Sequence, residues 1–199
     1  MATTLFLVRH AVHDRVSSVL CGRMPGVILG DEGRRQAAAL AARLAREGIG
    51  AIYTSPLERA RETAAPIAER LGLVPQVSEG VAEIDFGEWT GRSFASLDGD
   101  PDWVRWNEAR ATSRTPGGES MIEAQDRAVH AVERLCALHP GERIAIVSHC
   151  DVIKAVLAHY LTVTLDGLHR FDVAPASVSA LAVWQGGGKV LGMNEAVVA

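Results

Sequence analysis

The chain has 199 residues, of which 48% are hydrophobic and 22% charged, a balance typical of one globular domain over residues 1–199. Its formal net charge is -4 at pH 7, so the protein has no overall positive field with which to hold nucleic acid or an anionic membrane. Any site for an anion must therefore be formed locally.

The cysteines and the first residues predict a reducing compartment. Cys21, Cys136 and Cys150 are widely spaced and form no CxxC pair, which disfavours both a disulfide framework and a zinc site. No segment approaches the ~20 apolar residues of a membrane-spanning helix, and the first residues lack the pattern of an export signal. We expect a cytoplasmic protein with reduced thiols that needs no metal and no cofactor.

Predicted strands and helices alternate along the chain. Apolar residues 4–8 predict a short buried strand, and residues 31–48 predict a helix that stops at Gly48. The helix after the next strand opens at Pro56, and Pro66 must kink or split it. The other predicted elements, in chain order, are a strand at 51–55, a loop at 78–91, a short helix at 101–110, a loop at 113–120, a helix at 120–141, a strand at 143–149, a helix at 150–161, a late strand at 177–184 with a sheet edge as one place for it, and a turn and tail at 185–199.

The order of these elements predicts the fold class. Strands that are apolar throughout are buried on both faces, and strands that alternate with helices form parallel sheets. We therefore expect a single-domain α/β protein, a three-layer sandwich with a mainly parallel sheet and helices on both faces. Ser120 and Glu123 have the spacing of a capping box, and Trp103 and Trp106 are expected to pack against the body of the protein.

Polar residues follow three of the predicted strands. Arg9 and His10 end the first strand, Arg59 comes one turn after the second, and His149 follows the strand at 143–149. Ligands of open parallel sheets bind outside the carboxyl ends of the strands. We therefore expect these side chains to emerge together at one rim of the sheet, exposed to solvent.

Each of these residues alone has a plainer explanation, as a surface pair or a loop histidine. Arg59 is the hardest to dismiss, because the first turn of a helix disfavours a cation and favours an anion. Two arginines and two histidines together describe a phosphate pocket, in which charge-assisted hydrogen bonds contribute ~1.5 to 3 kcal/mol each. Arg61, two positions after Arg59, points to another face and is expected to be solvated.

Motifs along nearly the whole chain resemble those of the histidine phosphatase superfamily, the group that includes the cofactor-dependent phosphoglycerate mutases. The matching segments, in the order of the family, are "LVRHA", "GVILGDEGRRQAAALAARL", "YTSPLERARETA", "EIDFGEWTG", "PGGES" and "IVSHCDVIKAVLAHYL". The resemblance implies that His10 is the nucleophile that becomes phosphohistidine. It also implies that Arg9, Arg59 and His149 bind the phosphate of a small metabolite, and that Glu83 is the proton donor.

The chemistry of these residues is consistent with the implied roles. A neutral imidazole attacks phosphorus, and the neighbouring Arg9 and Arg59 lower the pKa of His10 and so keep it neutral. Glu83 beside a phosphate dianion has a raised pKa and a proton to give to the leaving oxygen. The choice of Glu83 over Asp85 or Glu88 rests on its position in the family motif.

Three departures from the family pattern bear on the pocket. Ala11 and Cys150 stand where the family has glycine, and each adds a β-carbon near the phosphate. Cys150 either narrows the pocket or points away from it. The asparagine that many members carry a turn after the nucleophile is missing, and Ser17 or Ser18 is a candidate donor in its place.

The acid loop "EIDFGEWTG" resembles that of the family's phosphatases more than that of its mutases. We therefore expect a metal-independent hydrolase of the histidine acid phosphatase type, with a phosphoglycerate mutase-type phosphotransferase as the alternative. A non-catalytic phosphate-binding module is a third reading, disfavoured because no catalytic residue is missing. Arg23 and Arg114 are either contacts for a second anionic group or solvated cations. The oligomeric state is open, with a homodimer as one alternative.

Overall fold

Six strands form one sheet in the computed structural model, which describes residues 1–197. They are β1 Thr3–Arg9, β2 Ala51–Thr54, β3 Gln76–Val77, β4 Arg143–Ser148, β5 Ser177–Trp184 and β6 Gly187–Ala196. Their order in space is β3-β2-β4-β1-β5-β6. The first four of these strands pair in parallel, while β5 is antiparallel to both β1 and β6. The sheet is therefore mainly parallel, as the sequence predicts.

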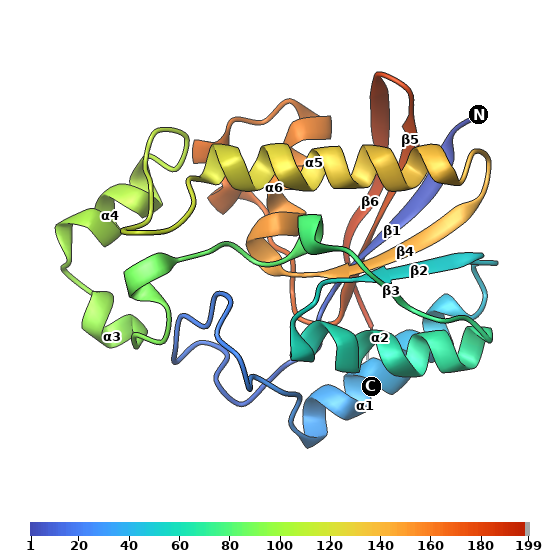
Figure 1. The fold of residues 1–199 in the computed structure, drawn as a ribbon, viewed down its shortest axis with the longest axis horizontal. Helices are drawn as coiled ribbons and strands as arrows, with labels where there is room; N and C mark the ends of the chain where they lie inside the picture. The colour runs from blue at the N-terminus through green and yellow to red at the C-terminus, as the bar shows by residue number, and fades with distance from the viewer. Residues whose placement is uncertain (198–199) are drawn as a thin grey trace.

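Helices cover both faces of this sheet (Figure 1). The α-helices are α1 Asp31–Leu44, α2 Glu58–Leu71, α3 Phe94–Leu97, α4 Pro101–Glu108, α5 Met121–Leu138 and α6 Cys150–Leu161, and the short 3-10 helices are η1 Glu79–Val81, η2 Gly87–Trp89 and η3 Leu165–Arg170. Leu5 and Leu7 of β1 pack with α5 and α6, whereas Phe6 and Val8 pack with α1 and α2. Burial on both faces explains why β1 is apolar throughout, and it confirms the three-layer α/β architecture.

A third apolar cluster lies at one end of the sheet, where the loop after β1 meets the segment that contains α3 and α4 (Figure 1). Trp106 is fully buried there, and its ring is 6.2 Å from that of Trp89 and 6.1 Å from that of Phe86. Trp103 packs against Trp89 with ring centroids 5.3 Å apart. The predicted packing of both tryptophans is confirmed, and the cluster fixes the segment that carries Glu83 over the strand ends.

Helix α2 differs from its prediction. It begins at Glu58, two residues after Pro56, and runs without a break through Pro66 to Leu71. A proline removes one backbone hydrogen bond, but Pro66 lies on the partly exposed side of the helix, where water can reach the carbonyl that it frees. The buried face, which includes Ile67, packs against α1 and the sheet and keeps the helix continuous, so the predicted split at Pro66 is wrong. Helix α1 also ends earlier than predicted, at Leu44.

For the C-terminal segment the sequence predicts a turn and tail; the turn at residues 185–186 is confirmed, and the tail is wrong. Residues Gly187–Ala196 form β6, which pairs with β5, so that β5 is an interior strand and β6 is the edge. Most side chains of β6 are exposed or half-buried, so the segment lacks the apolar run that identified the other strands. Residues 198 and 199 of the predicted tail lie outside the described residues.

The start of α5 confirms the predicted capping box. The Ser120 hydroxyl accepts a hydrogen bond from the backbone N–H of Glu123, and the Glu123 carboxylate accepts one from the N–H of Ser120. Among residues 1–197, no helix is both long and apolar enough to cross a membrane.

Candidate active site

The side chains that follow β1 and β2 meet at a cavity of about 240 Å³ beyond the strand ends. Arg9 is the last residue of β1, His10 follows it, and Arg59 lies in the first turn of α2. Glu83 comes from the loop between η1 and η2, and Asp151 from the first turn of α6. All five line the cavity, as does Ser17. The structure therefore brings together five of the predicted site residues and adds a carboxylate that the sequence did not single out.

The sequence predicts His10 at a solvent-exposed rim, and this prediction is wrong. His10 lines the cavity but is buried, with an exposed fraction of 3%. Its Nδ1 lies 2.8 Å from the carbonyl oxygen of Ala11. Because a carbonyl only accepts, Nδ1 carries the hydrogen and Nε2 keeps the lone pair. Burial, and next the charge of Arg59, hold the pKa of His10 well below its ordinary value. The ring is therefore neutral and has one defined nucleophilic nitrogen.

Arg59 is a buried cation whose hydrogen-bonding capacity is only partly used. Its exposed fraction is 2%, and its Nη2 donates to the carbonyl oxygen of Gly22 at 2.7 Å. Among the residues that the structure describes, Nε and Nη1 have no hydrogen-bond partner. A buried donor without an acceptor costs stability, so this guanidinium is prepared for an anion in the cavity.

Arg9 and His149 flank His10. Arg9 donates from Nη1 to the carbonyl oxygen of Val173 at 2.6 Å, and its Nε is buried without a partner among residues 1–197. His149 is fully buried, with Nε2 2.7 Å from the Ser55 hydroxyl and its ring centroid 5.2 Å from that of His10. It adjoins His10 but does not line the cavity. Burial, followed by the charge of Arg59, lowers the pKa of His149.

Glu83 differs from the other two carboxylates of its loop. It is 8% exposed, and its Oε1 accepts a hydrogen bond from the backbone N–H of Ile84 at 3.0 Å. Burial, and then the negative charge of Asp151, raise the pKa of Glu83 to about 7. By contrast, Asp85 is half-buried and accepts from the N–H of Gly87, and Glu88 is exposed. Only Glu83 of the three lines the cavity, a placement consistent with the proton donor.

Sequence reasoning missed His13, which lines the cavity together with His10. Its ring stacks on that of His10 with centroids 5.4 Å apart and an angle of 29° between the planes. Burial, and next the charge of Arg59, lower the pKa of His13 to about 4. His13 lies in an irregular loop three residues after His10, where no periodic pattern predicts which side chains turn inward. The short spacing from the nucleophile was the only available signal.

The structure shows the surroundings of the three positions that depart from the family pattern. Ala11 is fully buried against α1 and α2, and its N–H donates to the Thr63 hydroxyl at 3.0 Å. The thiol of Cys150 points to the carbonyl oxygen of Val173 at 3.6 Å, and burial raises the pKa of that thiol to about 11, which excludes a reactive thiolate at neutral pH. Ser17 is exposed, has a φ of 66°, and lines the cavity.

The two outlying arginines are engaged within the protein. Arg23 pairs with Glu119 at 3.0 Å, and Arg114 pairs with Glu123. Arg114 is exposed, as expected of a solvated cation, and Arg23 is half-buried. A contact of either arginine with a second anionic group stays a prediction. Arg61 is exposed, as predicted. Within residues 1–197, no group of three or more histidine, cysteine, aspartate or glutamate side chains is placed to hold a metal ion.

Comparison with known proteins identifies the family. The model of the histidine phosphatase superfamily (branch 1) matches residues 5–196. Phosphoserine phosphatase 1 of Hydrogenobacter thermophilus is 31% identical over 96% of this chain and 91% of its own length. Glucosyl-3-phosphoglycerate phosphatase of Mycobacterium tuberculosis is 33% identical over 80% of this chain and 76% of its own.

Solved structures agree with these relatives. Bacillus stearothermophilus YhfR superimposes with a TM-score of 0.91 at 30% identity, covering 98% of each chain. The mycobacterial glucosyl-3-phosphoglycerate phosphatase superimposes with a TM-score of 0.88 at 28% identity, over 98% of this chain and 100% of the other. The protein therefore belongs to the histidine phosphatase superfamily, as one of its phosphatases.

Proposed function

We propose that the protein hydrolyses phosphate monoesters of small metabolites through a phosphohistidine on His10, with Glu83 as proton donor and without a metal ion. The observation that carries this proposal is the buried Arg59 guanidinium with two unpartnered nitrogens beside a neutral imidazole. An incoming phosphoryl group supplies the missing acceptors, and its oxygens then lie next to Nε2 of His10. Arg9 adds a further donor through its own unpartnered Nε, and Ser17 another at the wall of the cavity.

In the first step, Nε2 of His10 attacks phosphorus, the bond from phosphorus to the ester oxygen breaks, and Glu83 gives its proton to that oxygen. The arginines hold the charge of the transferring oxygens, which is where phosphoryl transfer needs stabilisation. In the second step, the Glu83 carboxylate takes a proton from water, and the resulting hydroxide attacks phosphorus. The bond between phosphorus and Nε2 breaks, inorganic phosphate leaves, and His10 returns to its neutral form. His149 keeps its place beside the ring during both steps.

The relatives support phosphate esters of alcohols as the substrate class. The relatives named above are phosphatases of phosphoserine and of glucosyl-3-phosphoglycerate, both phosphate esters of alcohols, and the mycobacterial enzyme has been solved with VO3 and with inorganic phosphate. A screen over alkyl phosphates that begins with these two compounds tests the class. Residues 1–199 as a single domain and a cytoplasmic location remain predictions, the latter supported by three free cysteines. A homodimer remains one alternative.

His10→Ala is expected to abolish turnover, because no other group supplies the nucleophile. Wild-type protein given a phosphate donor should carry an acid-labile, base-stable label that the variant lacks. The variant should remain folded, since His10 makes one side-chain hydrogen bond, and to its neighbour Ala11. Thermal unfolding followed by circular dichroism checks this. A variant with wild-type activity would refute the assignment.

Glu83→Gln is expected to slow formation of the phosphoenzyme from 3-phosphoglycerate by ~10² to 10⁴-fold, the usual contribution of a positioned acid. p-Nitrophenyl phosphate should be slowed much less, because its phenolate leaves without a proton. Single-turnover kinetics with both substrates measure the difference, and Asp85→Asn and Glu88→Gln serve as matched controls. Equal slowing of the two substrates would show that Glu83 is not the acid, and a control with the same leaving-group dependence would show that another carboxylate is.

The pH dependence should report the same group. As pH rises through about 7, Glu83 loses its proton and kcat/KM for 3-phosphoglycerate should fall, whereas His10 stays neutral well into the acidic range. We therefore expect activity to persist on the acidic side, as in an acid phosphatase. Asp151→Asn removes a negative charge that favours the protonated form of Glu83, so it should move the fall to lower pH. Profiles divided by that of Glu83→Gln remove the titration of the substrate; a ratio independent of pH would contradict the assignment.

The phosphatase is distinguished from a mutase by the fate of 3-phosphoglycerate. With catalytic 2,3-bisphosphoglycerate present, we expect release of inorganic phosphate and little 2-phosphoglycerate, because the cavity opens to water that can reach the phosphoenzyme. The same rate with and without a metal chelator is expected, because the arginines supply the positive charge. Fast isomerisation with negligible release of phosphate would establish the mutase instead.

A further inference from the structure

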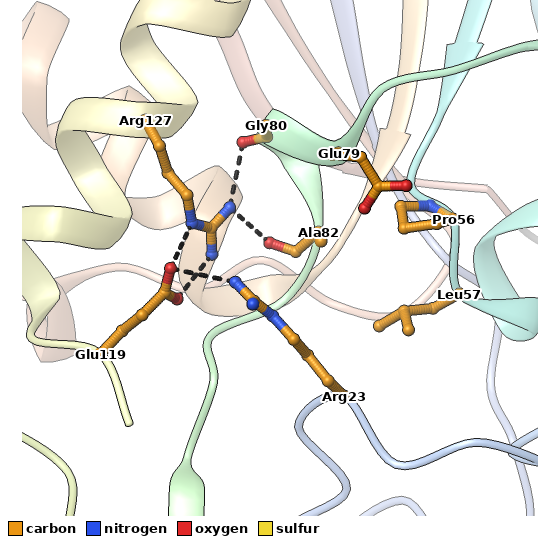
Figure 2. Close-up of a pocket in the computed structure, with 8 residues that line it drawn as sticks. All are labelled: Arg23, Pro56, Leu57, Glu79, Gly80, Ala82, Glu119 and Arg127. Atoms are coloured by element: carbon orange, nitrogen blue, oxygen red, sulfur yellow. Dashed lines mark hydrogen bonds and ion pairs between the residues drawn. The ribbon is translucent and has the colours of Figure 1, made fainter. Parts of the chain in front are cut away.

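The loop that carries Glu83 is held by the side chain of Arg127, which reaches it from the middle of α5 (Figure 2). Arg127 donates from Nη1 to the carbonyl oxygens of Gly80 and Ala82 at 3.0 and 2.7 Å, and from Nη2 to that of Glu83 at 3.1 Å. Its remaining donors, on Nε and Nη2, reach the two oxygens of Glu119 at 2.7 and 2.9 Å. A guanidinium has five N–H donors, and all five are used here.

Glu119 holds the same loop on the other side of Glu83. Its Oε2 accepts a hydrogen bond from the backbone N–H of Asp85 at 3.0 Å, and its own N–H donates to the carbonyl oxygen of Asp85 at 2.8 Å. Arg127 and Glu119 therefore bind each other and fix the backbone both before and after Glu83. The side chain of Glu83 is left to line the catalytic cavity.

Arg23 connects this pair to the loop after β1, which forms another wall of the catalytic cavity. Its Nε donates to the carbonyl oxygen of Glu83 at 2.8 Å, and its Nη2 pairs with Glu119 at 3.0 Å. Figure 2 shows Arg23 and Arg127 approaching Glu119 from different sides. The carbonyl of Glu83 thus accepts hydrogen bonds from two guanidinium groups.

Polar contacts hold the backbone of this loop from the side of α5, while the side chains of Val81 and Ile84 are buried in the core. A second cavity, of about 420 Å³, is lined by Arg23, Glu119 and Arg127 together with Glu79, Gly80 and Ala82 (Figure 2). Open space therefore adjoins the backbone just before Glu83. Arg127 itself remains partly exposed, while the residues of α5 that enter the core include Ala128 and Val132. Loss of the Arg127 contacts would remove three hydrogen bonds to the loop backbone around Glu83 and leave the core packing of Val81 and Ile84 in place.

We propose that Arg127 and Glu119 are positioning residues that set the carboxyl group of Glu83 against the leaving oxygen of the substrate. The proposal rests on the proposed function, in which Glu83 is the proton donor. A misplacement of about 1 Å at a reacting group costs ~10²-fold in rate, and a loop with three carbonyl contacts removed can shift by that much. The charge of Arg127 is not what matters; the fork of five donors is.

Arg127→Lys tests this, because lysine keeps the positive charge but has three donors on one nitrogen. We expect single-turnover phosphoenzyme formation from 3-phosphoglycerate to slow by ~10²-fold, with p-nitrophenyl phosphate little changed. Arg114→Lys is the matched control, since Arg114 also pairs with a glutamate but does not contact the acid loop. It should behave as wild type. If Arg127→Lys does not fold, Glu119→Gln replaces it. Both oxygens of Glu119 accept hydrogen bonds from Arg127, so the NH2 group of glutamine faces a donor in either orientation.

A double-mutant cycle separates positioning from a general structural defect. In the Glu83→Gln background, Arg127→Lys should add no further slowing with 3-phosphoglycerate, because the group that it positions is no longer an acid. Equal slowing of both substrates, or effects that multiply in the double variant, would overturn the positioning role while leaving the proposed function intact. If Glu83→Gln itself shows no leaving-group dependence, the proton donor is misassigned and the positioning role falls with it.

Discussion

The rest of the site depends on one constraint, which is the burial of the Arg59 guanidinium with fewer hydrogen-bond acceptors than it has donors. Arg59 is fixed by one hydrogen bond to Gly22 and leaves two nitrogens unpartnered among the described residues. Its charge is the second cause, after burial, of the lowered pKa of His10, His13 and His149. The cation that we propose binds the phosphate thus also favours the neutral form of the three imidazoles. Binding and nucleophilicity follow from the same placement.

Glu83, the proposed proton donor, has its pKa shifted in opposite directions by its surroundings. Arg59 acts to lower the pKa of Glu83, but burial and the negative charge of Asp151 outweigh it. These shifts favour a neutral imidazole and a protonated carboxyl in one cavity, the state from which the proposed first step begins. Asp151 also pairs with Arg110 at 2.8 Å, which stabilises its negative charge beside a second carboxyl group.

The strand ends could be predicted from sequence, whereas the loops could not. Buried parallel strands appear as apolar runs, so the convergence of Arg9, His10 and Arg59 followed from the topology alone. His13 and Asp151 were not predicted, because the inward orientation of a side chain in a loop or a first helical turn depends on tertiary contacts. No local hydrophobic pattern encodes those contacts. The edge strand β6 was not predicted either, because its residues are exposed or half-buried and form no apolar pattern. Family motifs supplied Glu83, but only the structure separates it from Asp85 by burial and by contact with the cavity.

Backbone carbonyls, not carboxylates, orient the cations of the catalytic cavity. Arg59 donates to Gly22 and Arg9 to Val173, and neither arginine has an ion pair among residues 1–197. A carbonyl consumes one donor and fixes the side chain but leaves the full positive charge available, whereas a carboxylate would neutralise it and compete with phosphate. The Glu119–Arg127 ion pair lies instead behind the acid loop, where that arginine has no substrate charge to meet. Rigid placement is thereby obtained with neutral acceptors where charge must act on the substrate, and with a full ion pair where only position is required.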